Sequence, residues 1–165
     1  MRDRNDYIPG TRLRRVGDFT TPAFVKRYEG NPVLSCEHVP YPSTNTHNCG
    51  VIRYGQGYVM LFRNDARASR ETPNRATTCV GVADSPDGIR WTVRPEPAFA
   101  AYDPRITELE GRFYINCAEG GASTYVTDDF RTFEKIEQTL PVTRNQVLFP
   151  EKIHGKYYRL ERPTW

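Results

Sequence analysis

The chain has 165 residues, of which 26% are charged and 38% hydrophobic, and its formal net charge is +3. This composition is typical of a folded domain and excludes a chain that is disordered throughout. The basic residues are scattered, and no apolar run approaches the roughly 18 residues of a membrane span, so we expect neither a nucleic-acid partner nor membrane insertion.

Residues 1–30 are polar and irregular, and we expect an N-terminal arm with a short strand near residues 23–25. The first residues carry charges of both signs without the apolar stretch of a secretory signal, which predicts a cytoplasmic protein. The four cysteines include no C-x-x-C pair and the three histidines no H-E-x-x-H motif, so no metal site and no disulfide is expected.

From residue 31 to residue 165, two kinds of β-hairpin alternate. The first kind has a tight turn with glycine and an aromatic-rich second strand, and it occurs at 50–63, 104–116 and 147–160. We take Gly57, Gly111 and Gly155 as its turn glycines. The second kind joins a small-residue strand through an acidic turn to a strand carrying an aromatic residue, at 80–91 and 124–133.

Two hairpins in each period of roughly 45–55 residues make four strands, the content of one β-propeller blade. An antiparallel sandwich is the alternative, because hairpins alone do not dictate radial closure. The sequence holds two complete periods and the opening hairpin of a third, whereas a propeller typically needs four or more blades. The predicted fold is therefore all-β, a partial propeller of about two and a half blades over residues 31–165, truncated at the C-terminus or completed by something else.

Polar residues stand before the first strand of each period, at similar distances ahead of the turn glycine. They are Asn48, the pair Tyr102 and Asp103, and the pair Arg144 and Asn145. Because the innermost strands of a propeller line its central channel, we expect these side chains to converge on the axis.

Two further arginines, Arg63 and Arg162, end second strands. Each alone is more often a solvated strand end than a functional residue. Together with Arg144, however, Arg162 supplies two guanidinium groups beside an amide, which suits a phosphate or a carboxylate. Asp103 has two interpretations: a turn residue that caps the entering strand, or a general acid whose pKa is raised by partial burial.

Six motifs in this order resemble the β-mannoside phosphorylases of glycoside hydrolase family 130, over a stretch from about residue 25 to the C-terminus. They are NCGVIR at 48–53, MLFR at 60–63, DSPDGIRW at 84–91, YDPRIT at 102–107, RNQVLFPEK at 144–152 and RP at 162–163. The resemblance implies a five-bladed β-propeller that phosphorolyses β-mannosides with inversion to give α-mannose 1-phosphate. Its implied partners are a β-mannoside oligosaccharide and inorganic phosphate as co-substrate, with no cofactor.

The resemblance also implies a role for each candidate residue. Asp103 matches the proton donor, which acts through the mannose 3-hydroxyl. Positions around the mannose are matched by Asn48, Arg63 and Tyr102, and phosphate ligands by Arg144, Asn145 and Arg162. An inverting hydrolase needs a second carboxylate to activate water, whereas phosphate is already a nucleophile and needs a cationic site, so the arginines favour a phosphorylase.

Two alternatives stay open: a hydrolytic β-mannosidase of the same fold, and a carbohydrate-binding propeller fragment without catalysis. The family's remaining phosphate ligands, a lysine and a histidine, lie in later blades. If the 165 residues act alone, we expect weak or no activity. The uncovered apolar flank would then favour association, for example as a homo-oligomer.

Overall fold

The computed structural model describes residues 24–67, 77–139 and 143–163. The chain divides into two compact units, Met1–Asn31 and Pro32–Trp165. In the first unit, the expected short strand near residues 23–25 is wrong for the two positions that are described. Phe24 and Val25 lie in a turn and irregular backbone and are exposed, because no neighbouring strand pairs with them there. Ala23 lies outside the described residues.

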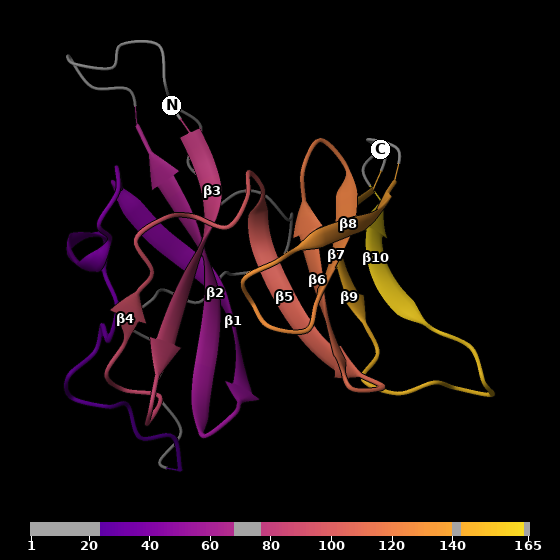
Figure 1. The fold of residues 1–165 in the computed structure, drawn as a ribbon, viewed down its shortest axis with the longest axis horizontal. Helices are drawn as coiled ribbons and strands as arrows, with labels where there is room; N and C mark the ends of the chain where they lie inside the picture. The colour runs from indigo at the N-terminus through magenta and orange to yellow at the C-terminus, as the bar shows by residue number, and fades with distance from the viewer. Residues whose placement is uncertain (1–23, 68–76, 140–142, 164–165) are drawn as a thin grey trace, which may run out of the picture. The chain divides into compact units, whose positions relative to one another are not determined.

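In the second unit, the described strands form three antiparallel sheets (Figure 1). The first sheet runs β1 (Asn45–Tyr54), β2 (Gly57–Ala66), β3 (Thr77–Ser85) and β4 (Thr92–Val93), after a 3₁₀ turn, η3 (Cys36–His38). The second runs β5 (Tyr102–Leu109), β6 (Arg112–Ala118), β7 (Ala122–Thr127) and β8 (Glu134–Gln138). The third holds β9 (Thr143–Leu148) and β10 (Arg159–Pro163). The two predicted four-stranded units and the opening hairpin of a third are therefore confirmed.

The alternation of side chains along β2 explains where the core lies. Val59 and Leu61 point to the face toward the second sheet, while Met60 and Phe62 point to the opposite face, and all four are buried. An apolar residue at every position is typical of a strand covered on both faces. The face bearing Val59 and Leu61 packs against the second sheet and forms the larger hydrophobic cluster.

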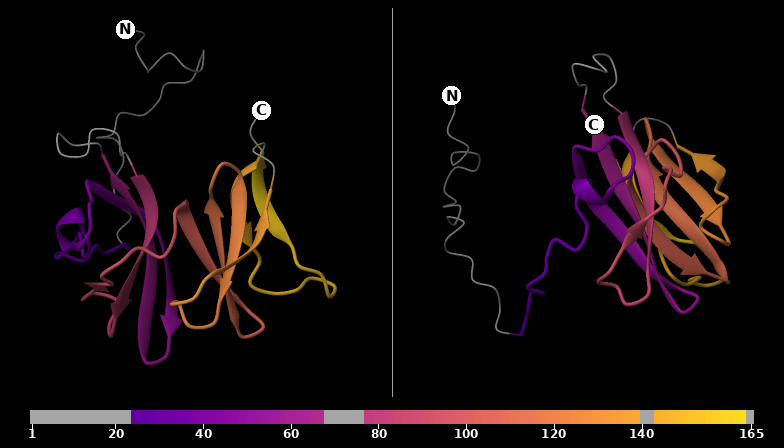
Figure 2. Two further views of the ribbon diagram at one scale, coloured as in Figure 1. Left: turned by 45° about the horizontal axis from the view of Figure 1, so that its top comes forward. Right: turned by 60° about the vertical axis from the view of Figure 1, so that its left-hand side comes forward.

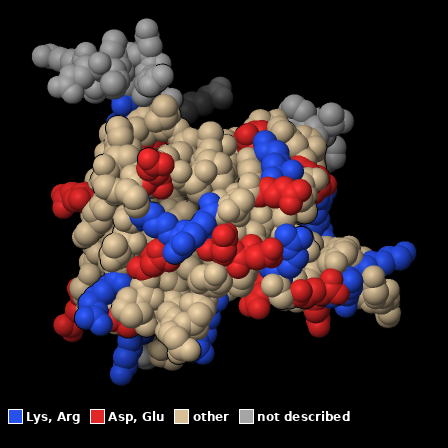
Figure 3. All heavy atoms as spheres, viewed as in Figure 1, with Lys and Arg blue, Asp and Glu red and all other residues tan. Residues whose placement is uncertain are grey.

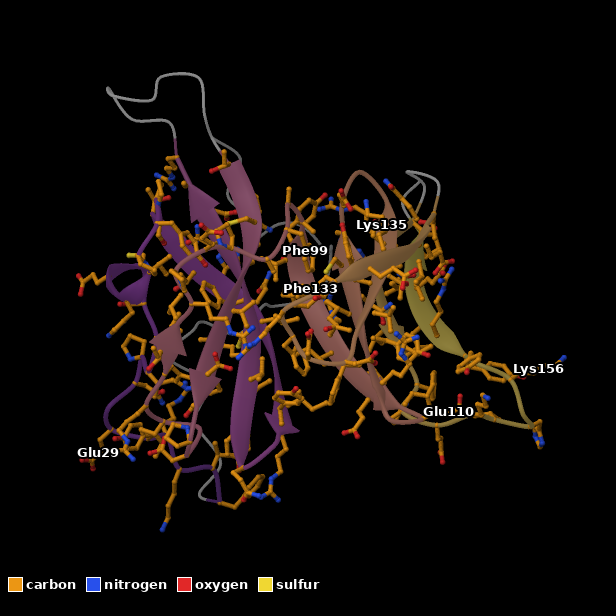
Figure 4. The ribbon with its side chains drawn as sticks, in the orientation of Figure 1. Glu29, Phe99, Glu110, Phe133, Lys135 and Lys156 are labelled. Atoms are coloured by element: carbon orange, nitrogen blue, oxygen red, sulfur yellow. The ribbon has the colours of Figure 1, made fainter. Side chains whose placement is uncertain are left out.

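Aromatic side chains fill the seam between the first and second sheets (Figure 4). Phe99 stacks on Tyr125 at 4.1 Å between ring centroids and meets Phe133 edge-on at 5.1 Å. Phe130 packs against Phe113 at 4.6 Å and against Tyr54, the last residue of β1, at 5.1 Å. This seam holds β5 beside β1 and so sets the distance between the two inner strands.

The acidic turns of the second hairpin type share one hydrogen-bond scheme. The Oδ1 atoms of Asp87 and Asp129 each accept two backbone N–H groups, from the second and third residues onward, at 2.8–2.9 Å. The hydroxyls of Ser85 and Thr127 accept the N–H three residues onward at 2.8 and 2.9 Å. Short polar side chains stabilise such turns locally, which is why the repeat was visible in the sequence. The aromatics expected inside the following strands stand immediately before them.

The third hairpin is more open than predicted (Figure 2). β9 ends at Leu148. The next residue, Phe149, still donates its N–H to the Tyr158 carbonyl at 2.9 Å. Pro150 follows and has no N–H, so the ladder cannot continue. The tight turn survives at its tip, where an isolated bridge joins Ile153 to Lys156. The strands expected over 147–160 are therefore interrupted.

The predicted turn glycines do not all occupy equivalent positions. Gly111 and Gly155 have φ of 76° and 74°, the left-handed conformation that a tight hairpin turn requires. In the first hairpin the left-handed residue is Gly55, at 58°, and Gly57 is the first residue of β2. The assignment of Gly57 as a turn residue is therefore wrong, and this glycine meets a different requirement.

Gly57 allows β2 and β3 to approach each other, since a Cβ at this position would lie 2.3 Å from the Ser85 carbonyl oxygen. We expect Gly57→Ala to lower the free energy of unfolding by about 1–3 kcal/mol, because backbone must move to admit the methyl group. Urea denaturation measures this loss. Gly55→Asn is the matched control, because its position is open and asparagine tolerates positive φ, so a larger loss there would contradict the argument.

The surface carries charges of both signs. On the face shown in Figure 3, basic and acidic side chains lie interspersed. Several charged side chains of the protein form ion pairs, such as Arg94 with Asp84 at 2.8 Å. In the part of the chain that the structure describes, no helix is long and apolar enough to cross a membrane.

Candidate active site

The inner strands β1, β5 and β9 each carry a β-bulge at the same place. The strand register shifts after His47 in β1, after Tyr102 in β5 and between Arg144 and Gln146 in β9. The bulged residues have left-handed backbone: φ is 48°, 58° and 52° at Asn48, Asp103 and Asn145. Among non-glycine residues, Asn and Asp adopt this conformation most readily. The bulges therefore explain why amide and carboxylate side chains recur at this point of each repeat.

The bulges bring two of the predicted residues into direct contact. β5 lies against β1 and β2, and the Asn48 Nδ2 atom donates a hydrogen bond of 2.7 Å to Asp103 Oδ1. From β2, the Arg63 NH1 atom donates to the same oxygen at 3.3 Å. Asp103 is only 8% exposed, so its carboxyl group is held by an amide and a guanidinium in a largely buried position.

The protonation of Asp103 differs from the expectation. Burial raises the pKa of this carboxyl group, but the hydrogen bonds from Asn48 and Arg63, together with the charges of Arg63 and Arg105, outweigh it. The net pKa lies below its ordinary value. Of the two interpretations of Asp103, the one with a raised pKa therefore does not describe the ligand-free protein, in which Asp103 is a carboxylate at neutral pH.

Tyr102 connects the first sheet with the third. The guanidinium carbon of Arg63 lies 5.2 Å from the centroid of its ring, and that of Arg144 lies 6.0 Å from the same centroid. At these distances both cations are attracted to the aromatic face. The structure thus groups five of the seven predicted site residues: Asn48, Arg63, Tyr102, Asp103 and Arg144.

The remaining two predicted residues, Asn145 and Arg162, lie on the third sheet next to Arg144. Arg162 is the cross-strand partner of Arg144 and is exposed to solvent. The Oδ1 atom of Asn145 is buried without a hydrogen-bond partner. Among the described residues, no hydrogen bond or ion pair joins Asn145 or Arg162 to Asp103, so the structure places them one sheet away from the carboxylate rather than against it.

His47 lies at an equivalent position of the first sheet, although it was not among the predicted site residues. In the bulged pairs, His47 faces Arg63, Tyr102 faces Ala118, and Arg144 faces Arg162, so His47 is the counterpart of Tyr102 and Arg144. A signal was available, because His47 precedes Asn48 just as Tyr102 precedes Asp103 and Arg144 precedes Asn145.

Asp65 was missed as well. It follows Arg63 by two positions on β2, and alternate residues of a strand share one face. Its Oδ1 atom accepts hydrogen bonds from Arg63 Nε at 3.0 Å and from Thr78 Oγ1 at 2.8 Å, and its Oδ2 atom lies 3.6 Å from His47 Nε2. The spacing Arg-x-Asp was therefore a usable signal.

The site offers one buried carboxylate, an adjacent guanidinium and amide, and two more guanidinium groups on the neighbouring sheet. Across residues 24–67, 77–139 and 143–163, no group of three or more His, Cys, Asp or Glu could hold a metal ion. The arrangement is chemically suited to proton transfer beside an anion-binding region.

Comparison with known proteins finds the same family by a family model and by individual relatives. A family model described as β-1,4-mannooligosaccharide phosphorylase matches residues 14–164. A β-1,4-mannooligosaccharide phosphorylase of Ruminococcus albus is 30% identical over 189 residues, covering 98% of this chain and 54% of the relative. A β-1,2-mannobiose phosphorylase of Listeria innocua is 30% identical over 121 residues, covering 63% of this chain and 34% of the relative. The chain thus spans about half or less of the length of these curated relatives.

Solved structures show the same fold. The β-1,2-mannobiose phosphorylase of Listeria innocua, in complex with β-1,2-mannobiose, superposes with a TM-score of 0.70 at 21% identity over 84% of this chain and 58% of that one. A structure reported for glycoside hydrolases that target β-1,2-mannosidic linkages in Candida mannan has a TM-score of 0.68 at 18% identity, covering 85% and 54%. This likeness confirms the predicted partial five-bladed propeller.

Proposed function

Since the chain belongs to glycoside hydrolase family 130, the family of β-1,4-mannooligosaccharide phosphorylases, we propose that it carries the proton-donor half of a β-mannoside phosphorylase site. In the proposed reaction a phosphate oxygen attacks the anomeric carbon of mannose from the α face. The glycosidic bond breaks, the leaving oxygen takes a proton, and α-mannose 1-phosphate forms with inversion. The observation that carries the proposal is the Asn48–Asp103–Arg63 cluster.

In this proposal Asp103 supplies the proton through the mannose 3-hydroxyl. The ligand-free carboxylate is kept ionised by the donors Asn48 and Arg63, while burial acts in the opposite direction. Sugar hydroxyl groups that take over these two donors would remove two of the interactions that lower the pKa of Asp103, and that pKa would rise. A higher pKa would favour the protonated carboxyl group that a general acid requires.

The third sheet would hold phosphate. Arg144 and Arg162 lie opposite each other on the β9–β10 ladder, and Asn145 follows Arg144 with an amide. Phosphate needs no base to activate it as a nucleophile, but its charge must be held beside the anomeric carbon. Two guanidinium groups provide charge and several donors. Tyr102, placed between Arg63 and Arg144, would line the junction of the mannose and phosphate sites.

The chain alone is proposed to be weakly active or inactive. It covers 54% of the Ruminococcus albus relative, and its third sheet has two described strands where the first and second have four. Binding of products should therefore be measured together with turnover.

The test is phosphate dependence. The purified protein is incubated with β-1,4-mannobiose with and without inorganic phosphate, and α-mannose 1-phosphate is followed by ³¹P NMR, both as product and, when added alone, by the line broadening that binding causes. We expect α-mannose 1-phosphate to form only when inorganic phosphate is present, or, if there is no turnover, added α-mannose 1-phosphate to bind. Free mannose released without phosphate would identify a hydrolase instead. The absence of both turnover and α-mannose 1-phosphate binding would overturn the proposal.

Arg162→Ala refines the same experiment. In a complete, active version of the protein, we expect it to weaken phosphate binding and raise the KM for phosphate, with a loss of roughly 2–4 kcal/mol in transition-state stabilisation, as when an electrostatic donor is removed. The matched control is Arg131→Ala in the exposed turn after β7, which should leave the phosphate dependence unchanged. Equal effects of the two substitutions would remove Arg162 from the phosphate site.

A further inference from the structure

Asp65 is fixed from three sides although it does not touch Asp103. Thr78 on β3 and Arg63 on β2 both donate to its Oδ1 atom, and His47 on β1 lies against its Oδ2 atom. Its side chain is 23% exposed. Burial raises the pKa of Asp65, but the hydrogen bonds from Arg63 and Thr78 and the charges of Arg63 and His47 outweigh it and lower the pKa overall. Asp65 is therefore an ionised, well-held carboxylate.

Arg63 joins this carboxylate to the one proposed to act in the reaction. Its Nε atom donates to Asp65 Oδ1 at 3.0 Å, while its NH1 atom, at the other end of the guanidinium, donates to Asp103 Oδ1 at 3.3 Å. A planar guanidinium can bind two acceptors in fixed directions, which an ammonium group cannot do. The shorter contact is the one to Asp65, so the guanidinium is anchored at Asp65 and reaches Asp103 with its free end.

We propose that Asp65 is a positioning residue that anchors Arg63 through Nε, so that NH1 meets Asp103 in the empty site and a sugar hydroxyl in the occupied one. The anchor would let Arg63 change partners at one end without leaving the site. The inference rests on the proposed function for its catalytic meaning, but the arrangement itself can be tested in the ligand-free protein.

A simpler account treats Asp65 as a neighbouring negative charge and nothing more. The two accounts predict opposite results when Asp65 is removed. As a mere charge, Asp65 raises the pKa of Asp103, and its loss would lower that pKa. As an anchor, Asp65 keeps Arg63 beside Asp103, and its loss would release Arg63 and raise the pKa of Asp103, because the hydrogen bond and the charge of Arg63 both lower that pKa.

Other groups around the two carboxylates must be included in this comparison. The titratable and charged side chains facing them are His47 on β1, Arg63 on β2, Cys79 on β3, Arg105 on β5 and Cys117 on β6. Burial raises the pKa of both cysteine thiols, with Asp65 adding to the rise at Cys79, so both thiols are neutral near pH 7. The substitutions below leave Arg105 and both cysteines in place.

The experiment follows the carboxyl ¹³C resonance of Asp103 through a pH titration of the 165-residue chain labelled at aspartate, with Asp103→Asn used for assignment. Asp65→Ala is expected to shift the titration of Asp103 to higher pH. Asp65→Asn keeps the Oδ1 acceptor for Arg63 and Thr78, so it should restore the parent titration or move it slightly lower. Asp84→Asn, which removes a carboxylate paired with Arg94 elsewhere, should have no effect.

The outcomes separate the two accounts. A shift to higher pH in Asp65→Ala that is absent in Asp65→Asn supports anchoring, whereas a shift to lower pH in both, or no shift in Asp65→Ala, overturns it. If Asp65→Ala does not fold, Thr78→Val replaces it. This substitution removes one of the hydrogen bonds that hold Asp65, so it should shift the titration of Asp103 to higher pH as well. A failure to phosphorolyse mannosides would leave these readings intact, so the two proposals fail independently.

Discussion

In a form of the protein that phosphorolyses mannosides, replacing Asp103 with asparagine is expected to lower the kcat by about 10²–10⁴-fold, the usual contribution of a general acid. Asparagine has nearly the same shape and keeps an oxygen that can accept from Asn48 and Arg63. It cannot deliver a proton, however. The measurement is the rate of α-mannose 1-phosphate formation at saturating mannoside and phosphate, relative to the unchanged protein.

The affinity for sugar distinguishes this result from simple damage to the site. If Asp103 acts as the acid, Asp103→Asn should lose turnover while mannoside binding, measured by calorimetry, stays nearly constant. The control is Asp128→Asn, which removes an exposed carboxylate paired with Arg112 at 2.9 Å in a turn of the second sheet. Turnover that survives Asp103→Asn would leave a sugar-binding role for the residue and require another acid.

Replacing Phe130 with alanine is expected to lower the free energy of unfolding by about 3–5 kcal/mol, the typical cost of removing a buried phenylalanine ring. Phe130 is fully buried and packs edge-to-face on Tyr54 from the first sheet and against Phe113 within the second. Its backbone carbonyl also accepts a hydrogen bond from Arg94, which follows β4. The ring therefore joins the two sheets as well as filling the core.

Alanine keeps the β-carbon of Phe130, so the left-handed backbone, with φ of 53°, is equally strained before and after the substitution. The measured change therefore reports packing. Ile136→Ala is the matched control, because Ile136 is 50% exposed and its truncation should change stability by no more than about 0.5 kcal/mol. Urea denaturation compares the two, and a similar small loss in both would contradict the role of Phe130 in the seam.

The strand content and the count of repeats could be predicted because their causes are local. The turns at Asp87 and Asp129 depend on residues that follow one another in the sequence. The same is true of the run of buried residues along β2. Gly57 was misassigned because its requirement is the carbonyl of Ser85, which comes from another strand and is invisible in a turn pattern. The third hairpin is interrupted for a local reason, because Pro150 lacks an N–H. This residue was visible in the sequence, but the prediction considered only the turn glycine.

For the site, the residues that come together could be predicted from the sequence, but the protonation of Asp103 could not. Asp103, Asn48 and Arg63 do meet, since equivalent positions in a repeat fold onto equivalent places. The direction of the pKa of Asp103 could not be predicted, because it depends on how closely two donors from the neighbouring sheet approach a partly buried group. Asp65, in contrast, could have been found, because the spacing of two residues places it on the same face of β2 as Arg63.

The left-handed bulges have an evolutionary consequence. At Asn48, Asp103 and Asn145 the backbone admits few residue types, and the two that fit best, asparagine and aspartate, differ by one nitrogen-for-oxygen exchange. A single-nucleotide change suffices for that exchange, so an acidic group can be gained, lost or transferred between neighbouring repeats without remodelling the chain. The backbone at these three bulges can therefore stay the same while the side chain changes between a neutral amide and an ionisable acid.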